Sequence, residues 1–480
     1  MSYSSRVRRF VFLGCAIVGA IAAAASLGAG CSPSSSAPDA STFTGRPGDL
    51  GSSSTVIDHS GANRGYAGAL QTGAVSGSWQ PAGCPGTVPL ADGVGNAVWG
   101  SDVYGANDKS PHAVHTSFRF DTSSSFAAIW ETDADTLASF VAYGDAPTKL
   151  DHFVQGVTFD DAPDTVSHLE YPLAVHEVHV CGLQPNHTYY FAVGGDGWYG
   201  NVYPITTGPP VGSTDAFRFV AMGDSNFFYS LFAQLEPLVA SYAPAFTLFT
   251  GDMIHDGTIQ SDWEQWFAAG GPTLASIPTM TVHGNHEAMA ADYFALFALP
   301  GVEEIYSFDF GDVHFVVLND SPTAGDTDLT TRQAQFLDQD LTAAEQRATP
   351  PAWFVTSHHR PMFSSDPDEG SNLTVRSAWQ SILEKHHVVA DFNGHAHHYE
   401  STQPLLGTNI VAPDAGGIRY MTVGGAGALF DSPTPTPNPW TITYYAGLSL
   451  AVIDVTPTTF TIHGYKVDGS PLEAPIVLQK

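Results

Sequence analysis

The second half of the chain carries short apolar runs, each of which ends in a polar cluster. The runs that read as buried strands lie at 217–222, 245–250, 278–282, 353–356 and 388–392. Stretches with helical spacing lie between or after them, at 231–242, 261–267 and 332–347. This alternation of strands and helices predicts a layered α/β domain, and further strands at 448–455 and 459–463 close the chain.

An earlier region, from about residue 95 to 210, has a different pattern of short alternating or apolar runs separated by Asp, Ser and Gly. These runs lie at 117–120, 127–132, 139–143, 177–181 and 189–193. Their spacing predicts an antiparallel β-sandwich. Pro209, Pro210 and Gly212 mark the boundary to the α/β domain, so we expect a sandwich over 91–212 and the α/β domain over 213–480.

The N-terminal residues 1–31 have the features of an export signal. Three arginines precede an uncharged, mostly apolar run over 10–26, and small residues then lead to Cys31. The end of this segment is similar to a bacterial lipoprotein signal in which Cys31 would be lipidated and tether the protein to a membrane, although Leu27 lies one place further from the cysteine than is usual. An uncleaved anchor is the alternative. Residues 32–90, rich in Ser, Gly and Pro, read as a flexible linker.

The composition narrows the choice of partners. The 480 residues include 48 acidic and 17 basic side chains, for a formal net charge of -31. Such a surface repels polyanions, so we expect no nucleic-acid binding, whereas a small phosphorylated substrate is compatible with metal ions in an acidic cleft. Of the four cysteines, Cys84 and Cys181 lie beyond the signal, and in an oxidising compartment they are expected to form a disulfide.

Five motifs carry the chemistry, and several of them directly follow an apolar run. They are Gly223-Asp224, Gly251-Asp252, Gly284-Asn285-His286-Glu287, His358-His359-Arg360-Pro361 and Gly394-His395-Ala396-His397. Loops at the carboxyl ends of parallel strands gather at one edge of a sheet, where ligands bind. Carboxylate, amide and imidazole donors converging there suit a pair of hydrolytic metal ions.

In these motifs and their order the chain resembles the calcineurin-like metallophosphoesterases, and among them the purple acid phosphatases. The resemblance extends over about 95–475 and includes the runs 305–315, 351–363 and 394–401. The sandwich, with Leu-x-Pro-Asn-x-Thr-Tyr-Tyr at 183–190, resembles the fibronectin-III-like domain that many of these enzymes carry. The resemblance implies that this sandwich precedes a layered α/β/β/α catalytic domain.

The resemblance also implies a set of ligands for two metal ions. Asp224, Asp252 and His397 would hold the first ion. Asp252 would bridge to the second ion, which Asn285, His359 and His395 complete. In the fourth motif, a gap-free alignment favours His359 over His358.

One position departs from the purple enzymes. They place a tyrosine three residues after the bridging aspartate, where this chain has His255. Other metallophosphoesterases use a histidine two residues after the first aspartate, where this chain has Asn226. We expect His255 to be the remaining first-metal ligand, with Asn226 or water as alternatives. Imidazole suits divalent metal better than iron(III), so a colourless enzyme is expected, with iron, zinc or manganese as the metal.

The expected function follows from the resemblance. His286 would contact the phosphate and protonate the leaving oxygen, and Arg360 would either pair with phosphate or form a structural ion pair. The expected protein is therefore an exported phosphatase, located in the periplasm, on the cell surface or secreted, that hydrolyses phosphate monoesters through a metal-bound hydroxide. Further histidines of the plant enzymes are absent, with acidic residues at 366–369 in their place. A phosphodiesterase and a non-catalytic binding protein are thus alternatives, and the sequence does not indicate an oligomeric state.

Overall fold

The computed structural model describes residues 55–56, 78–89, 110–133, 139–161, 173–195, 198–322, 325–432, 434 and 436–480. The expected signal at 1–31, its Cys31 and most of the expected linker lie outside these ranges, so export and lipidation stay predictions. Within the described ranges, no helix is long and apolar enough to cross a membrane.

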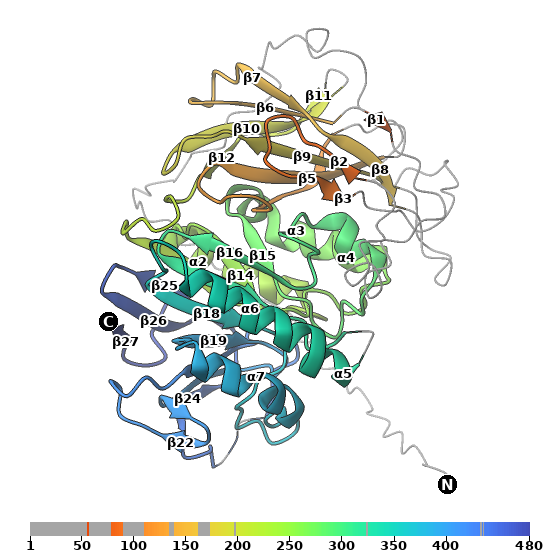
Figure 1. Ribbon diagram of the computed structural model, residues 1–480. Helices are drawn as coiled ribbons and strands as arrows, with labels where there is room; N and C mark the ends of the chain where they lie inside the picture. The colour runs from red at the N-terminus through yellow and green to blue at the C-terminus, as the bar shows by residue number, and fades with distance from the viewer. Residues whose placement is uncertain are drawn as a thin grey trace, which may run out of the picture. The chain divides into compact units, whose positions relative to one another are not determined.

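The N-terminal part is built from two β-sheets (Figure 1). One sheet has the order β1 (Thr55–Val56), β8 (Val157–Asp161), β9 (Leu173–Cys181), β5 (Ser125–Asp133) and β4 (His112–Ser117). The other has the order β11 (Trp198–Tyr199), β10 (Thr188–Gly195), β6 (Phe140–Gly144) and β7 (His152–Gln155), with β12 (Tyr203–Thr206) also on β10. Phe126 of β5 and Phe191 of β10 pack at a ring distance of 5.1 Å, which places the inner faces of the sheets against each other. The pairing is antiparallel except between β1 and β8.

The expected strand at 117–120 is displaced. β4 ends at Ser117, and the side chain of Arg119 instead donates from its Nη1 to the Leu299 carbonyl and to Glu303 Oε1, at 2.6 Å each. Ser117 Oγ likewise donates to the Ala298 carbonyl at 2.6 Å. These buried contacts join the sandwich to the α/β region that begins at residue 213, and both belong to a single compact unit.

The α/β region holds two larger sheets. The first has the order β15 (Thr279–Thr281), β14 (Thr247–Phe249), β13 (Phe217–Met222), β25 (Ser449–Val455), β26 (Thr459–Lys466) and β27 (Ile476–Gln479). The second has the order β16 (Tyr306–Phe310), β17 (Val313–Val317), β18 (Trp353–Ser357), β19 (Ala390–Asn393), β23 (Arg419–Val423), β20 (Tyr399–Thr402) and β24 (Thr441–Tyr445). Two short hairpins complete the described strands: β2 (Ser78–Trp79) with β3 (Val88–Pro89), and β21 (Leu405–Leu406) with β22 (Asn409–Ile410).

The two sheets pack face to face through aromatic side chains. Phe219 on β13 contacts Phe315 on β17 and Phe392 on β19, with ring distances of 5.3 and 6.0 Å. Helices cover the outer faces: α2 (Tyr229–Tyr242) and α3 (Gln260–Ser276) on the first sheet, α6 (Ala334–Glu345) and α7 (Leu373–Lys385) on the second. The remaining helices are short: α4 (Ala291–Leu296), α5 (Asp326–Asp328) and the π-helical η3 (Leu329–Gln333). The predicted α/β/β/α layering is confirmed.

Local sequence explains where these helices begin and end. The side chain of Asn372 accepts a hydrogen bond from the Val375 N–H and caps the first turn of α7. Helix α2 ends at Tyr242 and is followed by Ala243, whose φ of 47° is left-handed and whose successor is Pro244. β13, β14 and β15 run parallel to one another in the first sheet, as β18 and β19 do in the second, and one motif loop follows the carboxyl end of each of these five strands.

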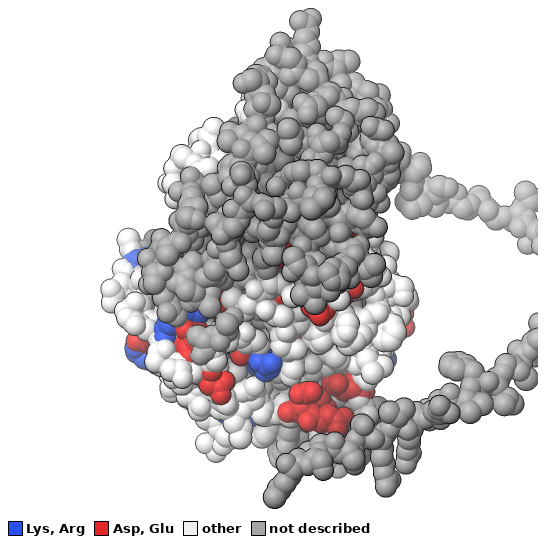
Figure 2. All heavy atoms as spheres, turned by 90° about the vertical axis from the view of Figure 1, so that its right-hand side faces the viewer, with Lys and Arg blue, Asp and Glu red and all other residues white. Residues whose placement is uncertain are grey.

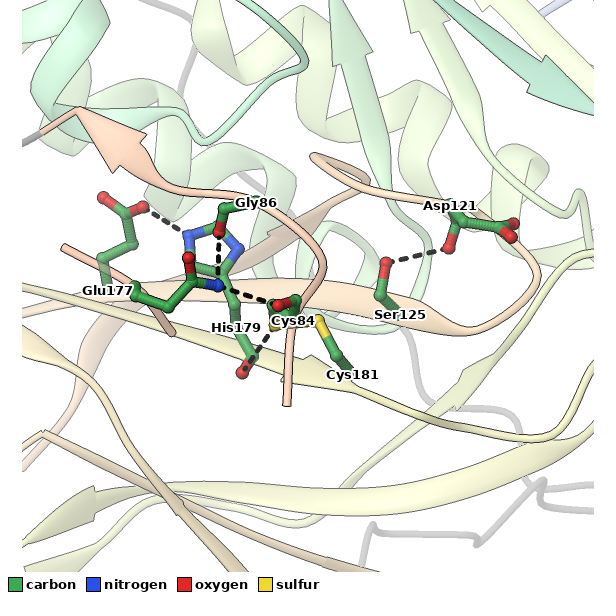
Figure 3. The surroundings of a disulfide bond; sticks show 8 residues. Cys84, Gly86, Asp121, Ser125, Glu177, His179 and Cys181 are labelled. Carbon is green, nitrogen blue, oxygen red and sulfur yellow. Dashed lines mark hydrogen bonds and ion pairs between the residues drawn. A yellow bond between two sulfur atoms is a disulfide. The ribbon is translucent and has the colours of Figure 1, made fainter. Parts of the chain in front are cut away.

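The Cys84–Cys181 disulfide is formed in the structure and ties the β2–β3 hairpin to the end of β9 (Figure 3). Gln80 Nε2 donates to the carbonyls of Cys84 and Gly86 and holds the intervening turn. The ring of Trp79 lies 5.7 Å from that of His179. The last residues of the expected linker are therefore packed on the sandwich.

Acidic side chains outnumber basic ones in the sequence, by 48 to 17. On the face drawn in Figure 2, acidic side chains of the described residues gather in patches and basic ones are few. This distribution agrees with the net charge of -31.

Candidate metal centre

Two groups of metal-ligating side chains meet at the edge where the motif loops converge. One consists of Asp252, His359 and His395, and the other of Asp224, Asp252 and His397. Within each group the ligand atoms all lie within 4.8 Å of one another. Because Asp252 belongs to both groups, its two carboxylate oxygens are placed to serve two neighbouring cations.

The backbone is held in unusual conformations at three of these positions. Asp224, Asp252 and His395 have φ angles of 64°, 51° and 65°, in the left-handed region that non-glycine residues rarely adopt. The glycines of the motifs allow the close approach: a Cβ on Gly284 would lie 2.3 Å from Asp252 Oδ1, and one on Gly394 would lie 2.3 Å from Asp224 Oδ2. Such strain is typical of sites whose surroundings fix a functional side chain.

Hydrogen bonds to one ring nitrogen orient three of the histidines. His359 donates from Nδ1 to the Thr250 carbonyl at 2.8 Å, which leaves Nε2 3.1 Å from Asp252 Oδ2 and 3.2 Å from Asn285 Oδ1. His397 donates from Nδ1 to the Leu429 carbonyl at 2.7 Å, and its Nε2 lies 3.7 Å from Asp224 Oδ1. His395 Nε2 lies 3.2 Å from Glu369 Oε2. Fixing one nitrogen as a donor directs the lone pair of the other, as metal-binding histidines require.

The electrostatics of the cluster favour a cation. Burial raises the pKa of Asp224 well above its ordinary value, and the nearby Asp252 adds to the shift. Burial would also raise the pKa of Asp252, but the imidazole of His359 lowers it below its usual range. Burial opposes a charge on His359 as well, yet the carboxylates of Asp252 and Asp224 raise its pKa to about 10. Positive charge between the two buried carboxylates is thus strongly stabilised.

Two buried side chains of the first motif loop have polar atoms without a hydrogen-bond partner among the described residues. They are Oδ2 of Asp224 and both amide atoms of Asn226. Both residues are completely buried, and an unsatisfied polar atom in such a place costs roughly 1–3 kcal/mol. Bound metal ions would satisfy such oxygens, so the donor set fits the two cations that the sequence indicated.

The remaining predicted residues are placed differently. His255 is in neither ligand group; its exposed imidazole packs on Phe227 at a ring distance of 3.9 Å. His286 Nδ1 donates to the His255 carbonyl, and its Nε2 lies 3.9 Å from Asp252 Oδ2. Arg360 donates from Nη1 to the Asp320 carbonyl and to Ser321 Oγ, which matches the structural pairing. A metal role for His255 and a phosphate role for Arg360 stay predictions.

Three residues that support the cluster were not assigned a role from the sequence. Glu287 accepts the backbone N–H groups of Asp252, Met253 and Gly284, and so joins two ligand loops. Asp320 accepts from the Arg360 N–H and contacts His358, which lies fully buried between Asp320 and Asp391. Glu287 is the last residue of the motif that begins at Gly284, so the sequence contained a signal by which its role could have been found. Asp320 and Glu369 lie outside the motifs, and only the fold brings them to the site.

Comparison with known families decides the identity of this arrangement. Residues 111–207 match the purple acid phosphatase N-terminal domain, and residues 217–399 match the calcineurin-like phosphoesterase family. The chain belongs to the calcineurin-like phosphoesterases of the purple acid phosphatase type. As a member of this family it is a metal-dependent phosphoesterase, and the matched segment contains every motif from Asp224 to His397.

Individual relatives of this phosphoesterase agree with the family assignment. Purple acid phosphatase 22 of Arabidopsis thaliana is 28% identical over 345 residues, which cover 68% of this chain and 74% of the relative. The solved purple acid phosphatase PPD1 of yellow lupin superposes with a TM-score of 0.68 at 19% identity, over 77% of this chain and 74% of its own. PhoD superposes with a TM-score of 0.57 at 12% identity, over 78% and 92% respectively. These two structural likenesses show the shared fold.

Proposed function

We propose that the protein is an exported dinuclear-metal phosphatase that hydrolyses phosphate monoesters of small molecules. The observation that carries this proposal is that Asp252 is shared by two ligand groups. A single-metal site would need one group, whereas a carboxylate common to both is the arrangement of a paired centre.

Six side chains would hold the two ions. Asp224, Asp252 and His397 would bind the first, and Asp252, Asn285, His359 and His395 the second. We place Asn226 ahead of His255 as the remaining first-metal ligand, because its buried amide lacks a partner within the described residues while His255 is exposed and packed on Phe227. The variant Asn226→Ala should then lose first-site metal while His255→Ala retains it, as measured by elemental analysis. The reverse result would restore His255.

The bound pair would supply Lewis acidity and an activated water for attack on phosphorus. The protein's own contribution is to orient the ester. His286 is anchored through Nδ1 to the His255 carbonyl, so its Nε2 faces the cluster, where it can hold a proton for the leaving oxygen. Because this chain has His255 where the purple enzymes place their tyrosine ligand, the protein is expected to be colourless, and an intense visible charge-transfer band would contradict this.

Phosphodiester hydrolysis is the second candidate, and one contact favours it. The Glu369 carboxylate lies 3.2 Å from His395 Nε2, on the side of the second ligand group. A monoester dianion is repelled by this carboxylate more than a diester monoanion is. The same fold would serve both reactions.

Hydrolysis of para-nitrophenyl phosphate and bis(para-nitrophenyl) phosphate, each with and without a chelator, tests the proposal. Chelator-sensitive hydrolysis that is faster for the monoester is expected. Faster diester hydrolysis would establish the second candidate. If neither ester is hydrolysed by the metal-loaded protein, the chain is a non-catalytic binding protein. His286→Ala should lower turnover while leaving the melting temperature unchanged.

A further inference from the structure

An aromatic residue beside the metal centre is both strained and exposed. Phe227 has a φ of 75°, which is an outlier for a bulky side chain, and 47% of its surface is exposed. Neither feature helps the protein to fold. Strain of this kind concentrates at binding and catalytic sites.

The contacts of Phe227 connect it to the residue that faces the ester. Its ring lies 3.9 Å from the His255 ring and 5.8 Å from the His286 ring, edge-on to the latter. The two imidazoles lie 5.4 Å apart and are joined by the hydrogen bond from His286 Nδ1 to the His255 carbonyl. The three rings therefore form one continuous surface that begins at His286 and ends in solvent at Phe227.

A second exposed apolar residue lies at the edge of the same centre. Leu429 is 69% exposed, and its carbonyl accepts the hydrogen bond that orients His397. The loop that carries it approaches the Phe227 loop, since a Cβ on Gly427 would lie 3.3 Å from the Phe228 carbonyl. Two exposed apolar side chains, those of Phe227 and Leu429, thus belong to loops near the first ligand group. Near the second group, by contrast, stands the carboxylate of Glu369.

We propose that Phe227, with His255 and Leu429, forms a subsite for the leaving group, and that it selects phosphoesters of flat, apolar alcohols. The role as a leaving-group subsite rests on the proposed function, in which His286 protonates the leaving oxygen. A planar group can stack on the exposed ring of Phe227 and remove apolar surface from water. The carboxylate of Glu369 disfavours leaving groups that carry further negative charge, such as additional phosphates.

Binding of two phosphonates to the metal-loaded protein tests this subsite without requiring turnover. Benzylphosphonate and ethylphosphonate present the same anion and differ in the ring. Calorimetry should show that the wild-type protein binds benzylphosphonate roughly 10-fold more tightly, the scale of an apolar pocket contact. Phe227→Gly should reduce this ratio to about 1, because glycine adopts the positive φ without strain and removes the ring.

Phe228→Ala is the matched control. Phe228 is 44% exposed and adjacent in sequence, but its ring has no contact with either imidazole among the described ring pairs. The control should keep the wild-type ratio, and Phe227→Tyr, which retains a ring, should keep it if the glycine variant fails to fold. Equal affinity of the two phosphonates for the wild type, or an unchanged ratio in Phe227→Gly, would overturn the subsite. Absence of ester hydrolysis with the ratio intact would overturn the phosphatase proposal alone.

Discussion

The backbone N–H of His395 donates to Asp224 Oδ1 over 2.8 Å, and so joins the last ligand loop to the first across 171 positions of the chain. The same aspartate keeps its other oxygen buried and without a partner in the described part of the chain. One oxygen thus organises the protein while the other is left for a ligand.

The contact between Glu369 and His395 predicts an effect on metal affinity. Glu369→Gln removes the charge that orients and polarises the imidazole, so affinity for the second ion should fall about 10- to 100-fold, as for other carboxylates behind a metal-binding histidine. Competition with a chromogenic chelator measures this. Asp368→Asn changes a neighbouring acidic residue that contacts Asp366 through its backbone, and should leave affinity unchanged. Equal losses in both variants would mean a general charge effect.

Glu287 should matter for stability even without metal. Its carboxylate accepts three buried backbone N–H groups, and Glu287→Gln would turn an N–H donor toward at least one of them. The expected loss is about 1–3 kcal/mol of unfolding free energy, measured by denaturant titration of the metal-free protein. If the variant were destabilised only when metal is present, Glu287 would act through metal binding instead.

The buried carboxyl of Glu236 on α2 predicts a dependence of stability on pH. Burial raises its pKa from 4.5 to about 8, so the folded chain holds a proton that the unfolded chain releases above pH 4.5. Between these values the free energy of unfolding should fall as pH rises, by up to about 1.4 kcal/mol per pH unit. Glu236→Gln is neutral throughout and should flatten the slope in chemical denaturation at about pH 5 to 8. Identical slopes would contradict the assignment.

Much of the fold could be predicted from the sequence because its signals are local. The runs at 217–222 and 353–356 are continuous apolar segments, and they became β13 and β18. The predicted strand at 117–120 did not form. Arg119 instead pairs with Glu303, which lies 184 residues away and which no local pattern reveals. Tertiary contacts of this kind override local alternation.

The candidate site shows the same limit. The motif residues Asp224, Asp252, His359, His395 and His397 could be selected because each lies in a short, recognisable motif. The imidazole of His255 packs on the ring of Phe227, a residue with a positive φ, and no local sequence pattern predicts this contact. Asn226 could be noted as an alternative from spacing, but its unpartnered burial is visible only in the folded chain.

The disulfide should stabilise the sandwich without serving catalysis. It closes a loop of 97 residues between Cys84 and Cys181, and both partners are remote from the ligand groups in sequence. Replacing both cysteines by serine should cost about 2–4 kcal/mol of unfolding free energy and lower the melting temperature. Turnover of the folded variant at low temperature should equal that of the wild type. A variant of unchanged stability would show that the bond does not constrain the unfolded chain.

The central claim is that Asp252 joins two cations in one centre. Anomalous scattering from crystals of the metal-loaded protein measures this directly. The account predicts two peaks about 3.5–4 Å apart, both in contact with Asp252, one beside Asp224 and His397 and the other beside His359 and His395. A single peak in a catalytically active crystal, or two peaks of which Asp252 touches one, would contradict it.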